Sequence, residues 1–261
     1  AYQTVAAMLA LNGVVTIMVD PIDQGERNQR TDIWGTQAHQ FAATSNNLVG
    51  RNTATWMIWD DLRAVDYLAS RPDVDAARLG VTGSSGGGTQ TSYLMAIDDR
   101  LIAAVPNSWL TTYAHVANEL GPQDAEQNTF GFVGRGMEQG DFVIMAASKA
   151  VQISAATQDF FPLAGTKQTF NYGKLIYERL GAGAMIDYFE GNTTHGFYQP
   201  QRQAAVAFLV KHLRGEDKVI VEPATVPTLS EAEIQVTPTG EVRNLAGYKS
   251  TWQINAEYEQ N

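Results

Sequence analysis

Residues Arg78–Gln90 read RLGVTGSSGGGTQ, and this stretch decides the fold. Arg78–Thr82 has the short, apolar character of a buried strand, and Gly86–Ile97 has the spacing of an amphipathic helix. Between them, positions 83–87 form a G-x-S-x-G pattern, which is typical of a sharp strand-to-helix turn that exposes its central serine. Small residues lie two positions away on each side because the turn is strained and crowded. The exposed residue is predicted to be Ser85, because a pattern centred on Ser84 would need glycine at position 82.

Apolar runs and amphipathic stretches alternate along most of the chain. The other predicted strands are Val14–Val19, Leu101–Val105, Ala150–Ala156 and Met185–Phe189, and the other predicted helices are Thr4–Leu11, Thr53–Ser70 and Gln203–Leu213. This alternation predicts an α/β fold with a mostly parallel sheet covered on both faces. Ligands of such sheets bind at the carboxyl ends of the strands. The polar segment 24–51 is expected to contain loops that line something.

Composition excludes several classes of function. The chain has 261 residues and a net charge of −10, which argues against a basic nucleic-acid footprint and a polybasic membrane anchor. It has no cysteine, so disulfides, a thiol nucleophile and Cys-type zinc sites are absent. The strand–helix rhythm stops near residue 215, where prolines become frequent. We therefore predict a catalytic domain over residues 1–214 and a C-terminal extension or linker over residues 215–261.

A serine nucleophile needs a histidine base, which follows it in the chain in this architecture. His195 lies just after the predicted strand Met185–Phe189, where the base is expected. Of the other histidines, His39 precedes the serine, His115 lies between two strands, and His212 is expected on the solvated face of the last helix.

The orienting acid is predicted to be Asp159, which follows the predicted strand Ala150–Ala156. Asp124 and Glu126 are competitors, but they lie one strand earlier and are better interpreted as lining the substrate cleft. Asp187 lies inside a strand and is expected to face away from the end of the sheet.

This set of residues predicts serine ester hydrolysis through an acyl-enzyme. His195 would take the proton of Ser85, Asp159 would orient the imidazole, and the N–H of Gly86 would stabilise the oxyanion. The mechanism needs no metal and no organic cofactor. A phosphate-binding loop is disfavoured because no lysine follows the glycines.

The sequence resembles α/β-hydrolases of the acetyl xylan esterase and dienelactone hydrolase type over residues 1–213. The resemblance rests on Asp20–Arg27, Asp66–Asp75, Gly83–Gly88, Asp159 and His195–Phe197. It implies a three-layer sandwich and a serine carboxylesterase, acting on short acyl groups such as acetyl on a carbohydrate. It also suggests a periplasmic or secreted location. A non-catalytic hydrolase-like domain and a serine peptidase of the same fold are the alternatives.

In that family the sheet has three strands before the one that Val14–Val19 matches, and this sequence contains no counterpart of those three strands. We therefore expect a missing N-terminal segment or a second chain to complete the sheet, because open strand edges are unfavourable. The ligand is expected to be a small-molecule or glycan ester, with neither nucleic acid nor membrane as a partner. Positions near strand ends suggest a set of substrate-binding candidates: Gln24, Glu26, Trp109, Glu126, Phe160 and Phe197.

Overall fold

The computed structural model describes residues 2–259, and the chain divides into two compact units. Unit 1 comprises Ala1–Ile17, Ala64–Pro122 and Gly131–Thr228, and unit 2 comprises Met18–Arg63, Gln123–Phe130 and Leu229–Asn261. Both units are therefore assembled from segments that are distant in sequence. The domain boundary predicted at residue 214 stays a prediction.

Unit 1 is built on a parallel sheet whose strands follow one another in chain order. Its strands are β1 (Leu79–Ser84), β2 (Leu101–Asn107), β3 (Ala150–Gln158) and β4 (Ile186–Thr194). At the carboxyl ends the register places Ser84 opposite Asn107, and Asn107 opposite Ser154. Polar residues of three neighbouring strands thus meet at the edge where ligands of such sheets bind.

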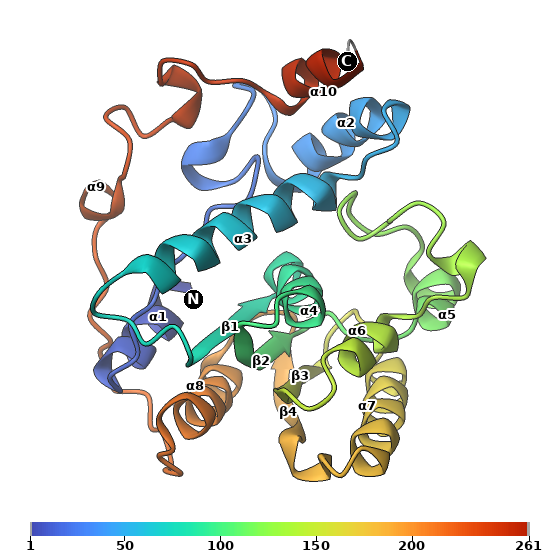
Figure 1. The fold of residues 1–261 in the computed structure, drawn as a ribbon, viewed down its shortest axis with the longest axis vertical. Helices are drawn as coiled ribbons and strands as arrows, with labels where there is room; N and C mark the ends of the chain where they lie inside the picture. Colours follow the sequence, from blue (N-terminus) through green and yellow to red (C-terminus); the bar gives the residue numbers. More distant parts are fainter. Residues whose placement is uncertain (1, 260–261) are drawn as a thin grey trace. The chain divides into compact units, whose positions relative to one another are not determined.

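Helices cover both faces of this sheet (Figure 1). One face carries α8 (Gln199–Arg214), which contacts all four strands, with α1 (Tyr2–Leu11) packed against it. The other face carries α4 (Gly86–Ile97) against β1 and β2, and α7 (Leu163–Arg179) against β3 and β4. The short helix α6 (Gln139–Met145) contacts both α4 and α7, and α5 spans Tyr113–His115. This arrangement is the α/β three-layer sandwich that the sequence predicts.

The core is divided by the sheet into two layers. Between the sheet and α8, Val105, Val206 and Leu209 form part of a continuous apolar cluster that reaches Met8 of α1. On the other side, Tyr93 packs edge-on against Trp109 and Phe142, with ring centroids 5.8 and 4.9 Å away. Burial on both faces explains why the inner strand β2 is a nearly continuous apolar run, whereas the edge strand β4 carries exposed Asp187 and Glu190.

The predicted strand Val14–Val19 is wrong. No strand of the described sheet pairs with this segment, and Val15, Ile17 and Met18 are exposed. An apolar run becomes a strand only where a neighbour satisfies its backbone N–H and C=O groups. In the described sheet β1 is an edge strand, and its pairing with another segment or chain stays a prediction.

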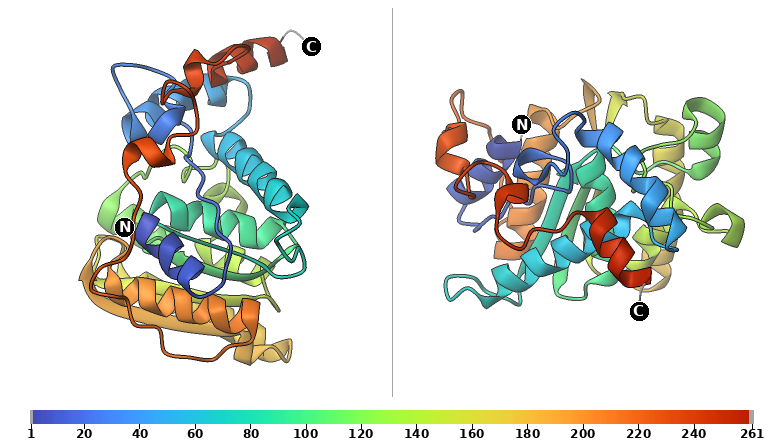
Figure 2. Two further views of the ribbon diagram at one scale, coloured as in Figure 1. Left: turned by 90° about the vertical axis from the view of Figure 1, so that its left-hand side faces the viewer. Right: turned by 90° about the horizontal axis from the view of Figure 1, so that it is seen from above.

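Unit 2 is mostly helix and connecting chain. It contains α2 (Gly35–Leu48), the first part of α3 (Thr53–Ser70), α9 (Glu231–Ile234) and α10 (Thr251–Glu259). The interpretation of residues 24–51 as loops therefore missed α2. Helix α10 packs on α2, where Asn255 Nδ2 donates to Asn46 Oδ1 at 2.9 Å. Figure 2 shows α10 beside α2 in both of its views.

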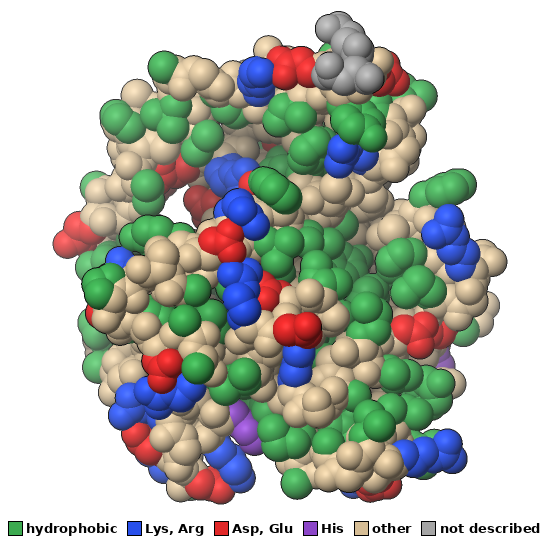
Figure 3. Space-filling view, in the orientation of Figure 1, with side chains coloured by type: hydrophobic (Ala, Val, Ile, Leu, Met, Phe, Trp, Pro, Cys, Tyr) green, Lys and Arg blue, Asp and Glu red, His purple; other side chains and the backbone are tan. Residues whose placement is uncertain are grey.

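Charged side chains of both signs are mixed on the face drawn in Figure 3, where no large basic area gathers. This mixture agrees with the acidic balance of the sequence. No helix among the described residues combines the length and apolar character needed to cross a lipid bilayer.

Candidate active site

Ser85 occupies a strained turn between β1 and α4. Its backbone angles are φ 59° and ψ −121°, a region that residues with a side chain rarely adopt. The Ser85 N–H donates to Asn107 O of β2 at 3.0 Å, which fixes the turn to the sheet. The strained angle holds the serine at the junction of strand and helix, half-exposed.

The glycines around Ser85 have different physical roles. A Cβ on Gly83 would lie 2.6 Å from the backbone of Gly87, and a Cβ on Gly88 would lie 2.4 Å from Asn107 O. A Cβ on Gly87 would meet nothing within 4 Å. Gly83 and Gly88 are therefore required by close backbone approach, whereas the sequence argument wrongly gave Gly87 the same role as Gly83.

Gly86 is the first residue of α4. The N–H groups of a helix's first turn have no acceptor inside the helix, and the helix dipole makes this end attractive for negative charge. The role of the Gly86 N–H as an oxyanion donor stays a prediction.

His195 and Asp159 come from the ends of β4 and β3 and lie in direct contact. His195 Nδ1 lies 2.8 Å from Asp159 Oδ1, and the side chain of Asp159 is only 3% exposed. Asp159 Oδ1 also accepts from Phe161 N–H at 3.0 Å. An ionised carboxylate can only accept, so this contact requires a proton on His195 Nδ1, and in the neutral imidazole Nε2 is then the acceptor.

Two aromatic rings flank the imidazole. The Phe160 ring centroid lies 4.2 Å from that of His195, and the Phe161 centroid lies 5.8 Å away. Phe161 is buried, whereas Phe160 is 52% exposed. Together the rings limit the movement of the imidazole and keep water from the Asp159 side.

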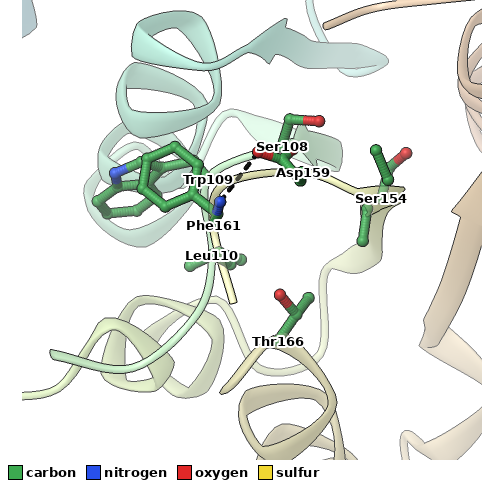
Figure 4. A pocket seen from close by; sticks show the side chains of 9 residues that line it. Ser108, Trp109, Leu110, Ser154, Asp159, Phe161 and Thr166 are labelled. Carbon is green, nitrogen blue, oxygen red and sulfur yellow. Dashed lines mark hydrogen bonds between the residues drawn. The ribbon is translucent and has the colours of Figure 1, made fainter. Parts of the chain in front are cut away.

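A small cavity lies behind Asp159 (Figure 4). Its volume is about 10 Å³, and its lining residues are Ser108, Trp109, Leu110, Ser154, Ala155, Ala156, Asp159, Phe161 and Thr166. Sites for small-molecule ligands are on the order of 300–1,000 Å³. This cavity is therefore too small to be the ester site.

The structure brings Asp159 and His195 together, but Ser85 and His195 are not hydrogen-bonded to each other among the described residues. Such contacts are often long in the absence of substrate. Asn107 of β2, which the sequence analysis missed, forms hydrogen bonds with the residue before Ser85 and with the residue after His195. Its amide contacts Ser84 Oγ and Gly196 O. The available sequence signal was a polar residue two positions after the apolar run Leu101–Val105, with Pro106 between them.

The predicted substrate-binding residues have different surroundings. Trp109 and Phe197 are buried core residues of unit 1, and such burial disfavours stacking on a sugar ring. Phe160 is exposed beside His195 and stays a candidate. Gln24, Glu26 and Glu126 belong to unit 2.

Within unit 2, Gln24 is exposed, but the two glutamates have protein partners. The Glu26 carboxylate accepts from the backbone N–H groups of Val236 and Thr237 at 2.6 and 2.8 Å, which attaches the C-terminal segment. A substrate group would have to displace these bonds. Their substrate roles stay predictions.

Glu126 is buried beside His39. Its Oε2 lies 3.2 Å from His39 Nδ1, and His39 Nε2 lies 2.8 Å from Ile22 O. Burial by itself lowers the pKa of His39, but the neighbouring Glu126 carboxylate and the Ile22 carbonyl outweigh it. The net effect is a pKa raised above the ordinary histidine value. Glu126 thus has a buried protein partner in His39.

A second unusual carboxyl group of unit 2 is Asp61 in α3. Its side chain is buried, and Oδ2 has no hydrogen-bond partner among the described residues. Burial, with a smaller effect of the Asp60 charge, raises the pKa of Asp61 to about 7.

No group of three or more His, Asp or Glu side chains in the described part of the chain is arranged to hold a metal ion.

Comparisons with known proteins give likenesses of fold and one short likeness of sequence. No protein-family model matches the chain. A Bacillus subtilis (strain 168) protein named "Putative hydrolase YtaP" is 41% identical over 58 residues, which are 22% of this chain and 19% of that protein. This match is too short to assign a family by itself.

Solved structures match over more of the chain. "Methylesterase BT1017" is similar with a TM-score of 0.62 and 25% identity, over 80% of this chain and 44% of that one. The glucuronoyl esterase catalytic domain from Hypocrea jecorina is similar with a TM-score of 0.54 and 18% identity, over 69% of this chain and 60% of that one. The chain thus spans about half the length of these structures. With a parallel sheet in this order and a strained serine where β1 turns into α4, the likeness shows that the chain has the α/β-hydrolase fold.

Proposed function

We propose that this chain carries the catalytic centre of a serine carboxylesterase that removes short ester-linked acyl groups, with acetyl as the first candidate, from a carbohydrate. The observation that carries the proposal is the strained Ser85 at the end of β1, in the same unit as the His195–Asp159 pair. A backbone strain of about 1–3 kcal/mol persists only where the surrounding structure enforces it. Such strain is expected where a side chain must be presented for chemistry.

Each residue has a defined role in the proposed reaction. His195 Nε2 takes the proton from Ser85 Oγ as that oxygen attacks the ester carbon. The Gly86 N–H donates to the developing oxyanion. Asp159 keeps the proton of His195 on Nδ1 and stabilises the imidazolium. His195 then protonates the leaving alcohol, and a water activated by the same histidine hydrolyses the acyl-enzyme.

The names of the similar structures support an ester substrate and add a second candidate. They are a methylesterase and glucuronoyl esterases. A methyl or glucuronoyl ester of a carbohydrate therefore belongs in the same test as an acetylated carbohydrate. The exposed ring of Phe160 beside His195 is the one predicted aromatic candidate that is accessible to a sugar in either case.

The first experiment is intact-mass analysis after treatment with a fluorophosphonate probe, for the natural chain and for Ser85→Ala. We expect one adduct on the natural chain and none on Ser85→Ala. Thr82→Val is the matched control, since it changes the same strand but should keep the adduct. A folded natural chain that forms no adduct would refute the proposal and favour a non-catalytic hydrolase-like domain.

Substrate class is then tested with a panel of p-nitrophenyl acetate, acetylated xylan, a methyl ester of galacturonate, a glucuronoyl ester and a peptide. Preference for acetylated xylan supports the first candidate. Preference for the methyl or glucuronoyl ester supports the second. Cleavage of the peptide alone would replace both by a serine peptidase.

A further inference from the structure

A row of three polar side chains crosses three strands at the carboxyl end of the sheet. Ser84 of β1, Asn107 of β2 and Ser154 of β3 are register partners. All three are almost completely buried, and Asn107 has no exposed surface. Buried polar groups are costly unless each hydrogen-bonding atom has a partner. The bonds of the central residue therefore show what this row does.

The side-chain amide of Asn107 is used at both of its ends. Nδ2 donates to Ser84 Oγ at 2.7 Å and to Gly196 O at 2.9 Å, and Oδ1 accepts from Ser154 Oγ at 2.7 Å. The carbonyl of Gly196 can only accept, so the atom that faces it must be the amide nitrogen. The orientation of the amide is thus determined by chemistry.

The backbone of Asn107 contacts the Ser85 turn as well. Its carbonyl oxygen accepts from Ser85 N–H at 3.0 Å and lies only 2.4 Å from the place that a Cβ on Gly88 would take. The same residue therefore holds two segments: the turn that carries Ser85, through its carbonyl oxygen, and Gly196 in the loop after His195, through its amide. These two segments come from opposite edges of the described sheet, β1 and β4.

We propose that Asn107 is a positioning residue that sets the separation between Ser85 and His195. The inference rests on the proposed function of these two residues. An amide satisfied at both ends in a buried site is rigid, so it transmits the position of β1 to the loop after β4. Nucleophile and base must be placed within a fraction of an ångström, and a misplacement of about 1 Å can cost about 100-fold in rate. Asn107 itself touches neither the ester nor the proton that moves.

Two substitutions at this position separate geometry from packing. Asn107→Asp keeps the shape but places an oxygen against Gly196 O. When the carboxyl group is ionised, this oxygen repels the Gly196 carbonyl oxygen. When the carboxyl group is protonated, its O–H can donate to that carbonyl oxygen. Burial raises the pKa of such a carboxyl, so the defect should shrink as the pH falls. Asn107→Ala removes the side chain, and Ser154→Ala removes one bond to Oδ1 while leaving both bonds from Nδ2.

The matched control is Thr82→Val. Thr82 Oγ1 donates to Val105 O at 2.8 Å, a side-chain bond between the same two strands but away from the Ser85 turn. If the row around Asn107 only stabilised the sheet, Thr82→Val and Asn107→Ala would both lower the melting temperature, and neither would change kcat.

The experiment measures kcat and KM for p-nitrophenyl acetate from pH 5 to 8, together with melting temperatures. We expect Asn107→Ala and Asn107→Asp at pH 8 to lose about 10- to 100-fold in kcat with KM changed less than about twofold. The loss in Asn107→Asp should become smaller toward pH 5. Ser154→Ala should lose less, and Thr82→Val should keep its kcat.

Other outcomes overturn the inference. If folded Asn107→Ala keeps the natural kcat at pH 8, the positioning role is refuted and the proposed function stays intact. If Asn107→Ala does not fold, Asn107→Asp and Ser154→Ala carry the test. If the folded natural chain neither hydrolyses any ester nor reacts with a fluorophosphonate, the proposed function fails, and the positioning role fails with it.

Discussion

Replacing Gly83 by alanine tests whether the geometry of the Ser85 turn depends on contact between two backbones. In the structure, a Cβ on Gly83 would lie 2.6 Å from the carbonyl carbon and oxygen of Gly87 and 2.8 Å from its Cα. Ordinary contact begins at 3.4 Å, so the methyl group is about 0.8 Å too close. The obstructing atoms are backbone, which means that β1 and α4 must move apart rather than a side chain rotating away.

The magnitude follows from this displacement. Overpacking a well-packed site costs about 1–3 kcal/mol, which for a chain of this size lowers the melting temperature by roughly 2–12 °C. The rate of the chemical step should fall as well, because Ser85 lies between the two elements that separate. A shift of the nucleophile approaching 1 Å should slow its reaction by about 100-fold.

The assay is the rate of phosphonylation by a fluorophosphonate, with melting temperature measured on the same samples. Gly87→Ala is the matched control, because a Cβ there meets nothing within 4 Å. Its backbone is helical, so alanine should stabilise the chain by about 0.5–1 kcal/mol and leave the labelling rate within about twofold. Equal labelling rates for Gly83→Ala and Gly87→Ala would refute the reasoning.

Three further predictions concern single side chains. The pKa of Asp61, raised from 3.8 to about 7 in the folded chain, destabilises the natural chain as the pH rises between those values. The free energy of unfolding gained by Asp61→Asn should therefore be larger at pH 8 than at pH 4, by up to about 4 kcal/mol. Urea unfolding at both pH values checks this, and a gain that does not change with pH would contradict it. The raised pKa of His39 beside Glu126 contributes stability that is complete below about pH 6.5 and is lost as the pH rises through the folded value. His39→Gln should therefore be most destabilising at low pH, and urea unfolding from pH 6 to 9 would show no such trend if the pair were neutral. Phe160→Ala should lower kcat for p-nitrophenyl acetate by about 2- to 10-fold, the value of an aromatic contact with His195, whereas Phe160→Tyr should not.

Much of the sheet could be predicted because each strand contains a short run of apolar residues. The predicted run Leu101–Val105 corresponds to β2, which extends to Asn107. The predicted run Met185–Phe189 corresponds to β4, which begins one residue later and ends five residues later, at Thr194. Val14–Val19 has the same composition and is not a strand. The difference lies in the neighbour that a strand needs, which is a property of the tertiary structure and leaves no mark in the run itself.

The failure at α2 has a different cause. Gly35–Leu48 is rich in Gln, Asn, Ser and Thr, and its apolar side is too narrow to be recognised as a helical pattern. Its inward positions are mostly small, such as Ala38 and Ala42, with the polar Asn46 buried beside them. Contacts with α10, more than 200 residues later, complete its packing. A local pattern cannot show stabilisation from such distant residues.

The candidate site shows the same limit at the scale of single residues. Ser85, Asp159 and His195 could be selected because serine at such a turn, and a carboxylate and a histidine after later strands, are residue types that perform chemistry in a known chain order. Asn107 has no such chemistry. Its part depends on the register that places it between Ser84 and Ser154 and on the carbonyl of Gly196, and none of these is local to it. Residues that react can thus be identified from type and order, whereas a residue that spaces them is identified only once the strands are paired.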